Sequence, residues 1–348
     1  PYTTLFRSTN GTSTVTVTAS TIGASGNSIA ISETLTNGSW AGGATALSGG
    51  VGAGWVELGI IPGEWLFIGG DTAGLKFTTA GNNGWVRAKT VTAATLTVDK
   101  TQGTTADEVA GALTVQVFFG DVIKNESDPD LIVRRSYQLE RSLSTAGYEY
   151  VVGCVANTLA IGIKTADKIT CELGFIATDS EQVEENARKA GTFPAVVESD
   201  AFNTSSDFAR LRLAGTDAFS TPLFAFLTEL NLSINNNVSP DKAVSVLGAF
   251  DMSTGDFVVE GTMTAYFADI TAVQAIRDNS DVSLDFSMVK NNAGWFIDVP
   301  LLTLGDGRLN VQKDKSIEIP LSIGAAAHQT FNHTLLACSF DYLPDAAE

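Results

Sequence analysis

Two histidines and three cysteines are the side chains of this chain best suited to nucleophilic, acid–base or metal chemistry. His328, His333 and Cys338 follow one another at equal spacings of five residues. Side chains five positions apart in a strand point to opposite faces, so this spacing does not place them around one metal ion or one substrate. Cys154 and Cys171 complete an odd, widely separated set, which is typical of buried free thiols. The sequence therefore predicts no metal site.

Other motifs that would indicate catalysis or nucleotide binding are missing. No Gly-x-Ser-x-Gly turn and no Gly-x-x-x-x-Gly-Lys-Ser/Thr loop occurs, and Gly50–Gly54 is only a fragment of a dinucleotide fingerprint. Glu126, Asp128 and Asp130 alternate as at the start of a calcium loop, but the required glycine and the distal glutamate are absent. Nothing singles out a carboxylate pair for glycoside hydrolysis among 39 acidic residues. We expect neither an enzyme nor a cofactor.

Charge and composition narrow the class of protein further. The 348 residues carry a formal net charge of −18, which argues against a protein that grips nucleic acid through its phosphates. With 44% hydrophobic and 17% charged residues, the chain should fold rather than stay disordered. The longest mainly apolar stretch, residues 151–163, is broken by Gly, Asn and Thr and is too short to cross a bilayer. The sequence predicts no membrane span.

The first eight residues, Pro-Tyr-Thr-Thr-Leu-Phe-Arg-Ser, resemble a translated sequencing adapter. We expect residues 1–8 to be non-native and to pack against nothing, with a genuine processed terminus as the alternative. Residues 9–58 are rich in Gly, Ser and Thr, yet Val15 and Val17, then Ile29 and Ile31, alternate with small polar residues. This period of two predicts short strands, with a flexible linker as the alternative.

The elements that would position any functional residue are predicted to be strands. Thirty-three glycines, nine prolines and abundant Thr, Val and Ser favour short strands joined by tight turns. Residues 59–125 should form a small β-barrel, with a half-sandwich as the alternative. Its five predicted strands are residues 64–68, 74–77, 85–89, 95–98 and 113–119. A polar, proline-containing stretch at residues 124–130 predicts a boundary.

An internal repeat is the most informative feature of the remaining chain. The first copy comprises residues 137–143, 148–163 and 169–177, and the second comprises residues 227–234, 243–252 and 257–267. Asp179 can cap a helix over residues 180–190, and Thr271 with Gln274 forms a capping-box spacing for a second helix. Glu172 and Glu260 occupy matching places before these helices. Four further strands are predicted at residues 282–289, 295–304, 317–323 and 335–343.

Several segments resemble the major tail tube proteins of long-tailed bacteriophages. They are Glu-Trp-Leu-Phe-Ile-Gly-Gly at 64–70, Asn-Asn-Gly-Trp-Val-Arg-Ala-Lys at 82–89, Arg-Arg-Ser-Tyr-Gln-Leu-Glu-Arg at 134–141, and Gly-Phe-Ile-Ala at 174–177. The resemblance covers about residues 59–348. It implies a mainly β (α+β) fold of two tandem tail-tube-like antiparallel β-sandwich or barrel units, each with one flank helix, plus the small inserted barrel. The expected units are residues 126–222 and 223–348.

The resemblance also implies a function. Copies of such a chain join side by side into rings, and the rings stack into a tube that conducts phage DNA without binding it specifically. The implied partners are other copies of the chain, a tape-measure protein, and tail-tip or neck proteins. The implied location is the virion tail, after assembly in the host cytoplasm. An extracellular all-β adhesion or carbohydrate-binding module is the alternative that shares the composition.

The polar faces of the two repeat hairpins are the predicted lining of the tube lumen, with the outer wall of the tube as the alternative. These residues are Gln138, Glu140, Ser142, Glu229, Asn231, Ser233 and Asn235. The alternate residues Leu139, Leu143, Leu230, Leu232 and Ile234 should face the core, as a period of two requires. If each repeat supplies about four strands, three chains make about 24 strands and a bore wide enough for DNA. A ring of three chains with pseudo-sixfold symmetry is therefore expected, with a hexamer as the competing arrangement.

Overall fold

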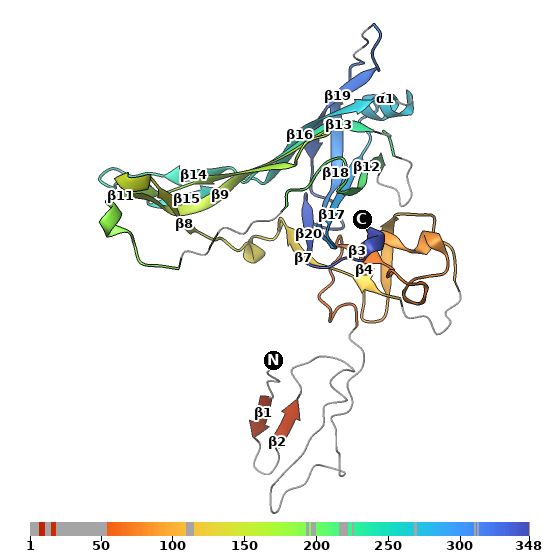
Figure 1. The fold of residues 1–348 in the computed structure, drawn as a ribbon, viewed down its shortest axis with the longest axis horizontal. Coiled ribbons are helices and arrows are strands. Elements are labelled where there is room, and N and C mark those ends of the chain that lie inside the picture. The colour runs from red at the N-terminus through yellow and green to blue at the C-terminus, as the bar shows by residue number, and fades with distance from the viewer. Residues whose placement is uncertain are drawn as a thin grey trace, which may run out of the picture. The chain divides into compact units, whose positions relative to one another are not determined.

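The computed structural model describes residues 7–10, 15–18, 54–108, 115–192, 195, 200–215, 222–224, 226–267, 270–309, 311 and 313–347. The chain divides into two compact units. The first comprises Pro1–Pro62 with Ala88–Val98, and the second comprises Gly63–Arg87 with Asp99–Glu348. Figure 1 shows the described elements as a ribbon.

The first unit contains a two-stranded antiparallel ribbon. Strand β1 (Arg7–Asn10) pairs with β2 (Val15–Thr18), as the alternation at Val15 and Val17 predicted. Arg7 and Ser8 pair with Thr18 and Val17, so the expectation that residues 1–8 pack against nothing is wrong for these two residues. The strand expected around residues 29–31 lies outside the described residues.

The second unit is built on one long antiparallel sheet with the strand order β10-β9-β13-β16-β19-β18-β17-β12. The strands are β9 (Tyr148–Lys164), β10 (Thr170–Ile176), β12 (Phe208–Gly215), β13 (Leu227–Asn235), β16 (Val258–Tyr266), β17 (Val282–Lys290), β18 (Ala293–Asp306) and β19 (Glu318–Ala325). Most coincide with strands predicted from the period of two. The mainly β prediction is therefore confirmed.

The two halves of this sheet enclose one hydrophobic core. The long strand β18 joins them, because its first part pairs with β17 and its last part with β19. Buried side chains from both halves, among them Leu232, Met263, Phe286 and Leu321, form one cluster. Helix α1 (Ile270–Arg277) packs Val273 and Ile276 against the same cluster. The result is a β-sandwich whose core is continuous through the sheet.

Strand β20 (Leu336–Phe340) extends the second layer by pairing with β18 and with β7 (Asp121–Lys124). Beside it lies a smaller sheet of order β5-β4-β3-β6. Its strands are β3 (Trp65–Ile68), β4 (Gly84–Val91), β5 (Leu96–Thr101) and β6 (Val117–Phe118). This four-stranded sheet is open, so the predicted closed barrel over residues 59–125 is wrong.

One strand predicted in this region is also absent. Residues 74–77 were expected to form a strand, but the chain makes the 3-10 turn η3 (Ala73–Leu75) instead. The side-chain amide of Asn83 donates to the Phe77 carbonyl and its oxygen accepts from the Phe77 amide, both at 2.9 Å. A side chain thus supplies the hydrogen bonds that a neighbouring strand would have provided. The further 3-10 turns are η4 (Ala80–Asn82), η5 (Pro129–Leu131), η6 (Ser144–Ala146), η7 (Glu185–Ala187) and η8 (Asp345–Ala347).

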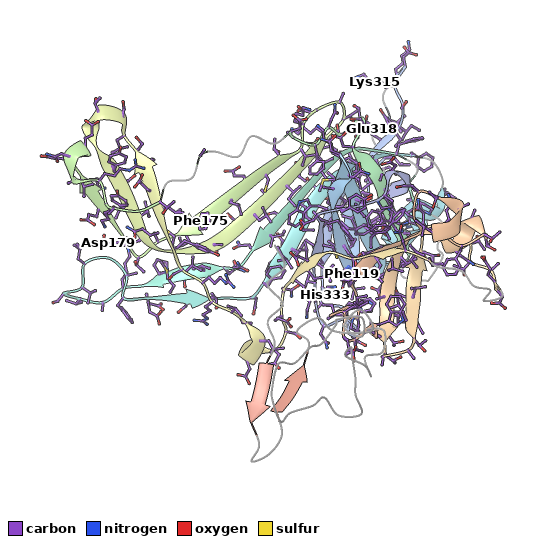
Figure 2. All side chains as sticks on the ribbon, turned by 60° about the horizontal axis from the view of Figure 1, so that its bottom comes forward. Phe119, Phe175, Asp179, Lys315, Glu318 and His333 are labelled. Carbon is purple, nitrogen blue, oxygen red and sulfur yellow. The ribbon has the colours of Figure 1, made fainter. Side chains whose placement is uncertain are left out.

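Two sets of strands reach beyond the sandwich and form what we call the arm. Strands β8 (Tyr137–Ser142) and β11 (Asp179–Val183) pair with the first half of β9. Strands β14 (Val238–Asp241) and β15 (Asp251–Thr254) form a separate ribbon. Figure 1 shows both sets at the end of the second unit opposite α1. Phe175 and Asp179 mark this region in Figure 2, well away from Glu318.

The helix predicted over residues 180–190 is wrong. Its first residues belong to β11, which pairs with Tyr148–Val152 of β9, and the turn η7 follows. Strand β9 is 17 residues long, so its first half projects beyond β13 and needs its own partners. Pairing with this free edge outweighs the helix signal of a capping residue. The second predicted helix exists as α1, although Thr271 lies inside it.

The two repeat copies occupy adjacent places in one sheet. Strand β9 of the first copy pairs directly with β13 of the second, and both contribute to the same core. Residues 243–252 do not form a long strand equivalent to β9, because β14 and β15 flank a loop there. The unit boundaries predicted from the sequence stay predictions.

Candidate lumen wall and buried charge cluster

One face of the sheet formed by β9, β13, β16 and β19 is polar and not covered by other described elements. Strand β13 alternates as predicted, since Leu230, Leu232 and Ile234 are buried in the core. Glu229, Asn231, Ser233 and Asn235 point to the opposite, partly or fully exposed face. Alternation across the pleat thus separates a core face from a polar face.

Direct cross-strand pairs extend this polar face over all of these strands. Asn231 lies opposite Gly162 and Thr262, and Thr262 lies opposite Ser322. We call this surface the wall face. Its residues are Thr158, Ala160, Gly162, Lys164, Glu229, Asn231, Ser233, Asn235, Val258, Glu260, Thr262, Thr264, Tyr266, Glu318, Pro320, Ser322 and Gly324. Small and short polar side chains dominate it, so the wall face is smooth.

A glycine lets the two central wall strands approach closely. A Cβ atom at Gly261 would lie 2.4 Å from the carbonyl oxygen of Asn231. Any larger residue there would push β16 away from β13. The glycine therefore keeps the centre of the wall sheet regular.

The wall face is acidic. Glu229, Glu260 and Glu318 lie on it, Glu172 of β10 continues it, and Lys164 is its one basic residue among those described. Lys164 Nζ lies 3.4 Å from Glu229 Oε1. A hydrogen bond from Asn231, assisted by Lys164, holds the pKa of Glu229 below its usual range. Glu229 therefore stays ionised at neutral pH.

The predicted lumen residues separate into two places. Those of β13 lie together on the wall face, whereas Gln138, Glu140 and Ser142 lie on β8, in the arm. Glu140 accepts a hydrogen bond from Arg188 Nε at 3.0 Å, and this bond holds its pKa below the usual range. Sequence reasoning did not single out Lys164 and Glu318 of the wall face, although the alternation in residues 317–323 signals Glu318.

The predicted core residues separate in the same way. Leu139 of β8 and Leu143, directly after that strand, are each 39% exposed, so the prediction that they face the core is wrong. Tyr137, nearby on the same strand, lies 6.3 Å from Phe175 between ring centroids, and both rings are exposed. The arm is a thin layer, so neither of its faces is fully buried.

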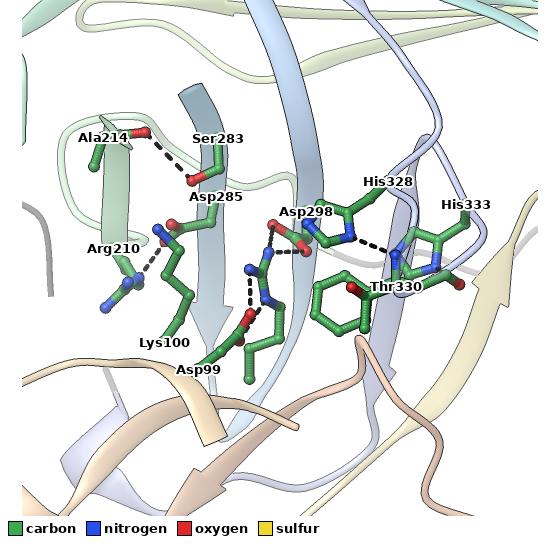
Figure 3. A network of polar contacts seen from close by, with 12 residues as sticks. Asp99, Lys100, Arg210, Ala214, Ser283, Asp285, Asp298, His328, Thr330 and His333 are labelled. Atoms are coloured by element: carbon green, nitrogen blue, oxygen red, sulfur yellow. Dashed lines mark hydrogen bonds and ion pairs between the residues drawn. The ribbon is translucent and has the colours of Figure 1, made fainter. Parts of the chain in front are cut away.

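A second polar site is buried beneath the small sheet (Figure 3). The guanidinium of Arg87 contacts Asp99 at 2.8 Å and Asp298 at 3.1 Å. It also lies over the ring of Phe331, 4.7 Å from its centroid. Burial by itself would lower the pKa of Arg87, but the carboxylates of Asp298 and Asp99 outweigh this effect and raise its pKa. Burial raises the pKa of Asp298 to about 6, against the effect of Arg87.

Two further cations complete this cluster. Arg210 pairs with Asp285 and lies over the ring of Trp65, 4.9 Å from its centroid. Lys100 Nζ donates to the carbonyl oxygen of Gly215 at 2.6 Å, and burial lowers the pKa of Lys100 to about 8. Buried charges of both signs alternate here, so each compensates another. The cluster ties the small sheet to β12, β17 and β18.

The two histidines flank Phe331 beside this cluster. The ring centroids of His328 and His333 lie 4.5 Å and 5.9 Å from that of Phe331. Burial lowers the pKa of His333 to about 4, and its Nε2 atom has no hydrogen-bond partner among the described residues. A buried neutral ring of this kind is a packing element rather than an acid–base catalyst.

The described residues contain no group of three or more His, Cys, Asp or Glu side chains placed to hold a metal ion. Cys154 and Cys338 are buried free thiols, as predicted, but Cys171 on β10 is exposed. In the described part of the chain, no helix has the length and apolar character needed to cross a membrane.

The fold and its surfaces define a class of protein. A β-sandwich with a smooth acidic face, a projecting arm and a buried charge cluster is suited to a structural role. The comparison with protein families agrees, because residues 11–327 match the model described as phage tail tube protein. The chain belongs to this family and is a structural component of the phage tail. No curated protein matches the sequence.

Proposed function

We propose that this chain forms rings that stack into a tail tube, and that the wall face lines the channel through which DNA leaves the virion. The observation that carries the proposal is the wall face itself. It is an uncovered, acidic surface, formed mostly by small and short polar side chains, on a sheet whose opposite face is the core. A wall that repels phosphates releases DNA, whereas a basic wall would retain it.

The outer edge of the sheet supports side-by-side association. Strand β10 pairs only with β9 among the described strands, so its other edge offers unpaired backbone groups. Leu173 on this strand is exposed, and so is the Cys171 side chain. An exposed apolar edge strand pairs readily with another chain. In a closed ring, each β10 edge would be covered by the next copy.

Strand arithmetic favours six copies in each ring. With its edge strand, the wall comprises β10, β9, β13, β16 and β19, so six chains supply about 30 strands, which close at a backbone diameter of about 65 Å. Side chains would leave roughly 50 Å for a duplex roughly 20 Å wide. Three chains would supply about 15 strands and a diameter of about 32 Å, too narrow once side chains are added.

The trimer was expected because each of the two repeats in a chain was predicted to supply its own section of the tube wall. Because β9 and β13 are neighbours in a single sheet, the strand order supports one wall per chain and therefore the hexamer. Contacts with a tape-measure protein and with tail-tip or neck proteins, and assembly in the host cytoplasm, stay predictions.

A pair of charge reversals tests the lumen assignment. We expect Glu229→Lys combined with Glu260→Lys to leave tube assembly intact and to slow DNA ejection from reconstituted phage, most strongly at low salt. Glu140→Lys is the matched change in the arm, and it should leave ejection at the wild-type rate if β8 does not line the channel. Unchanged ejection in the Glu229 and Glu260 variant, or slowed ejection only in the Glu140 variant, would contradict the wall assignment.

A further inference from the structure

The most exposed apolar side chains of the second unit lie at the tip of one hairpin. Strand β13 continues into β14, the chain turns at residues 242–250, and it returns through β15 into β16. Val244 and Leu247 in this turn are 96% and 89% exposed. Val246 and Phe250 are also exposed, so most of the apolar side chains of the turn contact little of their own chain. We call residues 242–250 the tip.

The tip is held in place by its backbone. The amide of Ala249 donates to the carbonyl of Thr178 at 2.9 Å, and the amide of Phe250 donates to that of Asp241 at 2.9 Å. Gly248 has a φ of +77°, and it packs directly against Thr178. The tip is therefore a preformed surface, and docking it would cost little conformational entropy.

The opposite end of the same hairpin carries a second exposed apolar surface. Phe226, just before β13, is 71% exposed, and Ile270 at the start of α1 is 63% exposed. The amide of Tyr266, at the end of β16, donates to the carbonyl of Phe226 at 3.1 Å, so their backbones are adjacent. We call Phe226 and Tyr266 the base patch. Figure 1 shows α1 and the arm at opposite ends of the second unit.

We infer that the tip of one chain docks on the base patch of a second copy in the next ring. This inference rests on the proposed function. Within one chain the two surfaces cannot meet, because the nine residues of β13 alone separate them by roughly 30 Å. Two different surfaces at opposite ends of a subunit make a head-to-tail contact, which builds a filament instead of a closed pair. This contact would join chains end to end, in the direction of the strands. Ring closure at β10 would instead join chains edge to edge, perpendicular to the strands.

Charge substitutions at each surface test the docking. Val244→Asp with Leu247→Asp, and separately Phe226→Asp, should leave rings visible by negative-stain microscopy and shorten or abolish tubes. Val133→Asp changes a valine that is 74% exposed and lies outside both surfaces, and it should form tubes of wild-type length. Tubes of normal length from either docking variant would overturn the inference. Wild-type chain that forms neither rings nor tubes would instead contradict the proposed function.

A crosslinking experiment tests the pairing itself. In a Cys171→Ser background, the remaining cysteines are buried, so new thiols report on new contacts. Chains carrying Leu247→Cys are mixed with chains carrying Phe226→Cys, assembled and oxidised. We expect disulfide-linked dimers between the two variants in tubes and none in isolated rings. Crosslinking that is equally strong in isolated rings would assign the tip to the contact within a ring and overturn the inference.

Discussion

Strands β13 and β8 carry similar alternating patterns, yet they lie in very different surroundings. In β13 the apolar positions fill the sandwich core, and Leu232 is only 1% exposed. In β8 the corresponding Leu139 lies in the arm and is 39% exposed. Glu229 of β13 joins an acidic face, whereas Glu140 of β8 is bound by Arg188. A period of two identifies a strand with two unlike faces, but it does not say what covers each face.

The difference separates two parts of the second unit. We call the sandwich with the small sheet the body, which is stable by itself, whereas the arm needs contacts with another chain to cover its apolar side chains. The body has a continuous core and a buried charge cluster, while the arm exposes apolar side chains on β8 and in the turn between β14 and β15. We expect substitutions in the body to lower the stability of the isolated chain. Matched substitutions in the arm should act mainly on assembly.

The largest expected effect comes from breaking the buried ion pairs. Arg87→Met leaves Asp298 and Asp99 without their cation, and removing one partner of a buried pair costs about 3–5 kcal/mol. Arg188→Met removes the cation of Glu140 in the arm and should leave the melting temperature close to that of wild type. Thermal and urea unfolding of the purified chains measure both. Equal losses in the two variants would contradict the distinction between body and arm.

Truncation of equivalent leucines gives a somewhat smaller contrast. Leu232→Ala opens a cavity in the core and should cost about 2–5 kcal/mol. Leu139→Ala removes a partly exposed side chain and should cost less than about 1 kcal/mol. The comparison is made from the midpoints of urea unfolding, provided that the dependence of the unfolding free energy on urea concentration is the same in both variants. A large loss for Leu139→Ala would show that the arm is already packed in the isolated chain.

The pH dependence of stability sharpens the account of the body. His333 stays neutral in the folded chain down to about pH 4, whereas in the unfolded chain it binds a proton below its ordinary pKa. Its contribution is therefore complete above about pH 6.5 and is lost as the pH falls towards 4. His333→Leu should gain about 3 kcal/mol relative to wild type between pH 6.5 and pH 4. A difference that does not change with pH would show that folding leaves the pKa of His333 at its ordinary value.

The smallest perturbation is chemical labelling of the three cysteines. Only Cys171 is exposed, and burial raises the pKa of the Cys338 thiol, so one thiol per unassembled chain should react with a maleimide. Ring closure over the β10 edge should protect Cys171. Mass spectrometry before and after assembly counts the labels. Full labelling in assembled tubes would remove β10 from the ring contact.

Much of the strand content could be predicted from the sequence, because strands such as β13, β16 and β18 have a clear alternation or long apolar runs. Strands β7 and β12 were not predicted, since β7 is short and Arg210 and Arg212 interrupt the apolar pattern of β12. Arg210 is buried only because Asp285 lies on the neighbouring strand. Long-range pairing of this kind has no local sequence signal. The same reason explains why β11 was mistaken for a helix.

Only part of the wall face could be predicted from the sequence, because the rest depends on long-range strand pairing. The residues of β13 could be grouped from their spacing, but their neighbours Lys164, Thr262 and Ser322 depend on strand order. The strand order also decides the number of walls in each chain. Sequence repetition suggested two equivalent units, whereas the sheet places both copies side by side.

Helical reconstruction of assembled tubes by electron cryomicroscopy tests the central claim most directly. The account predicts six copies in each ring, with Glu229, Asn231 and Glu260 facing the channel and Leu232 pointing away from it. Rings of three copies, or a channel lined by Glu140 of β8 while the wall face lies on the outer surface, would contradict it.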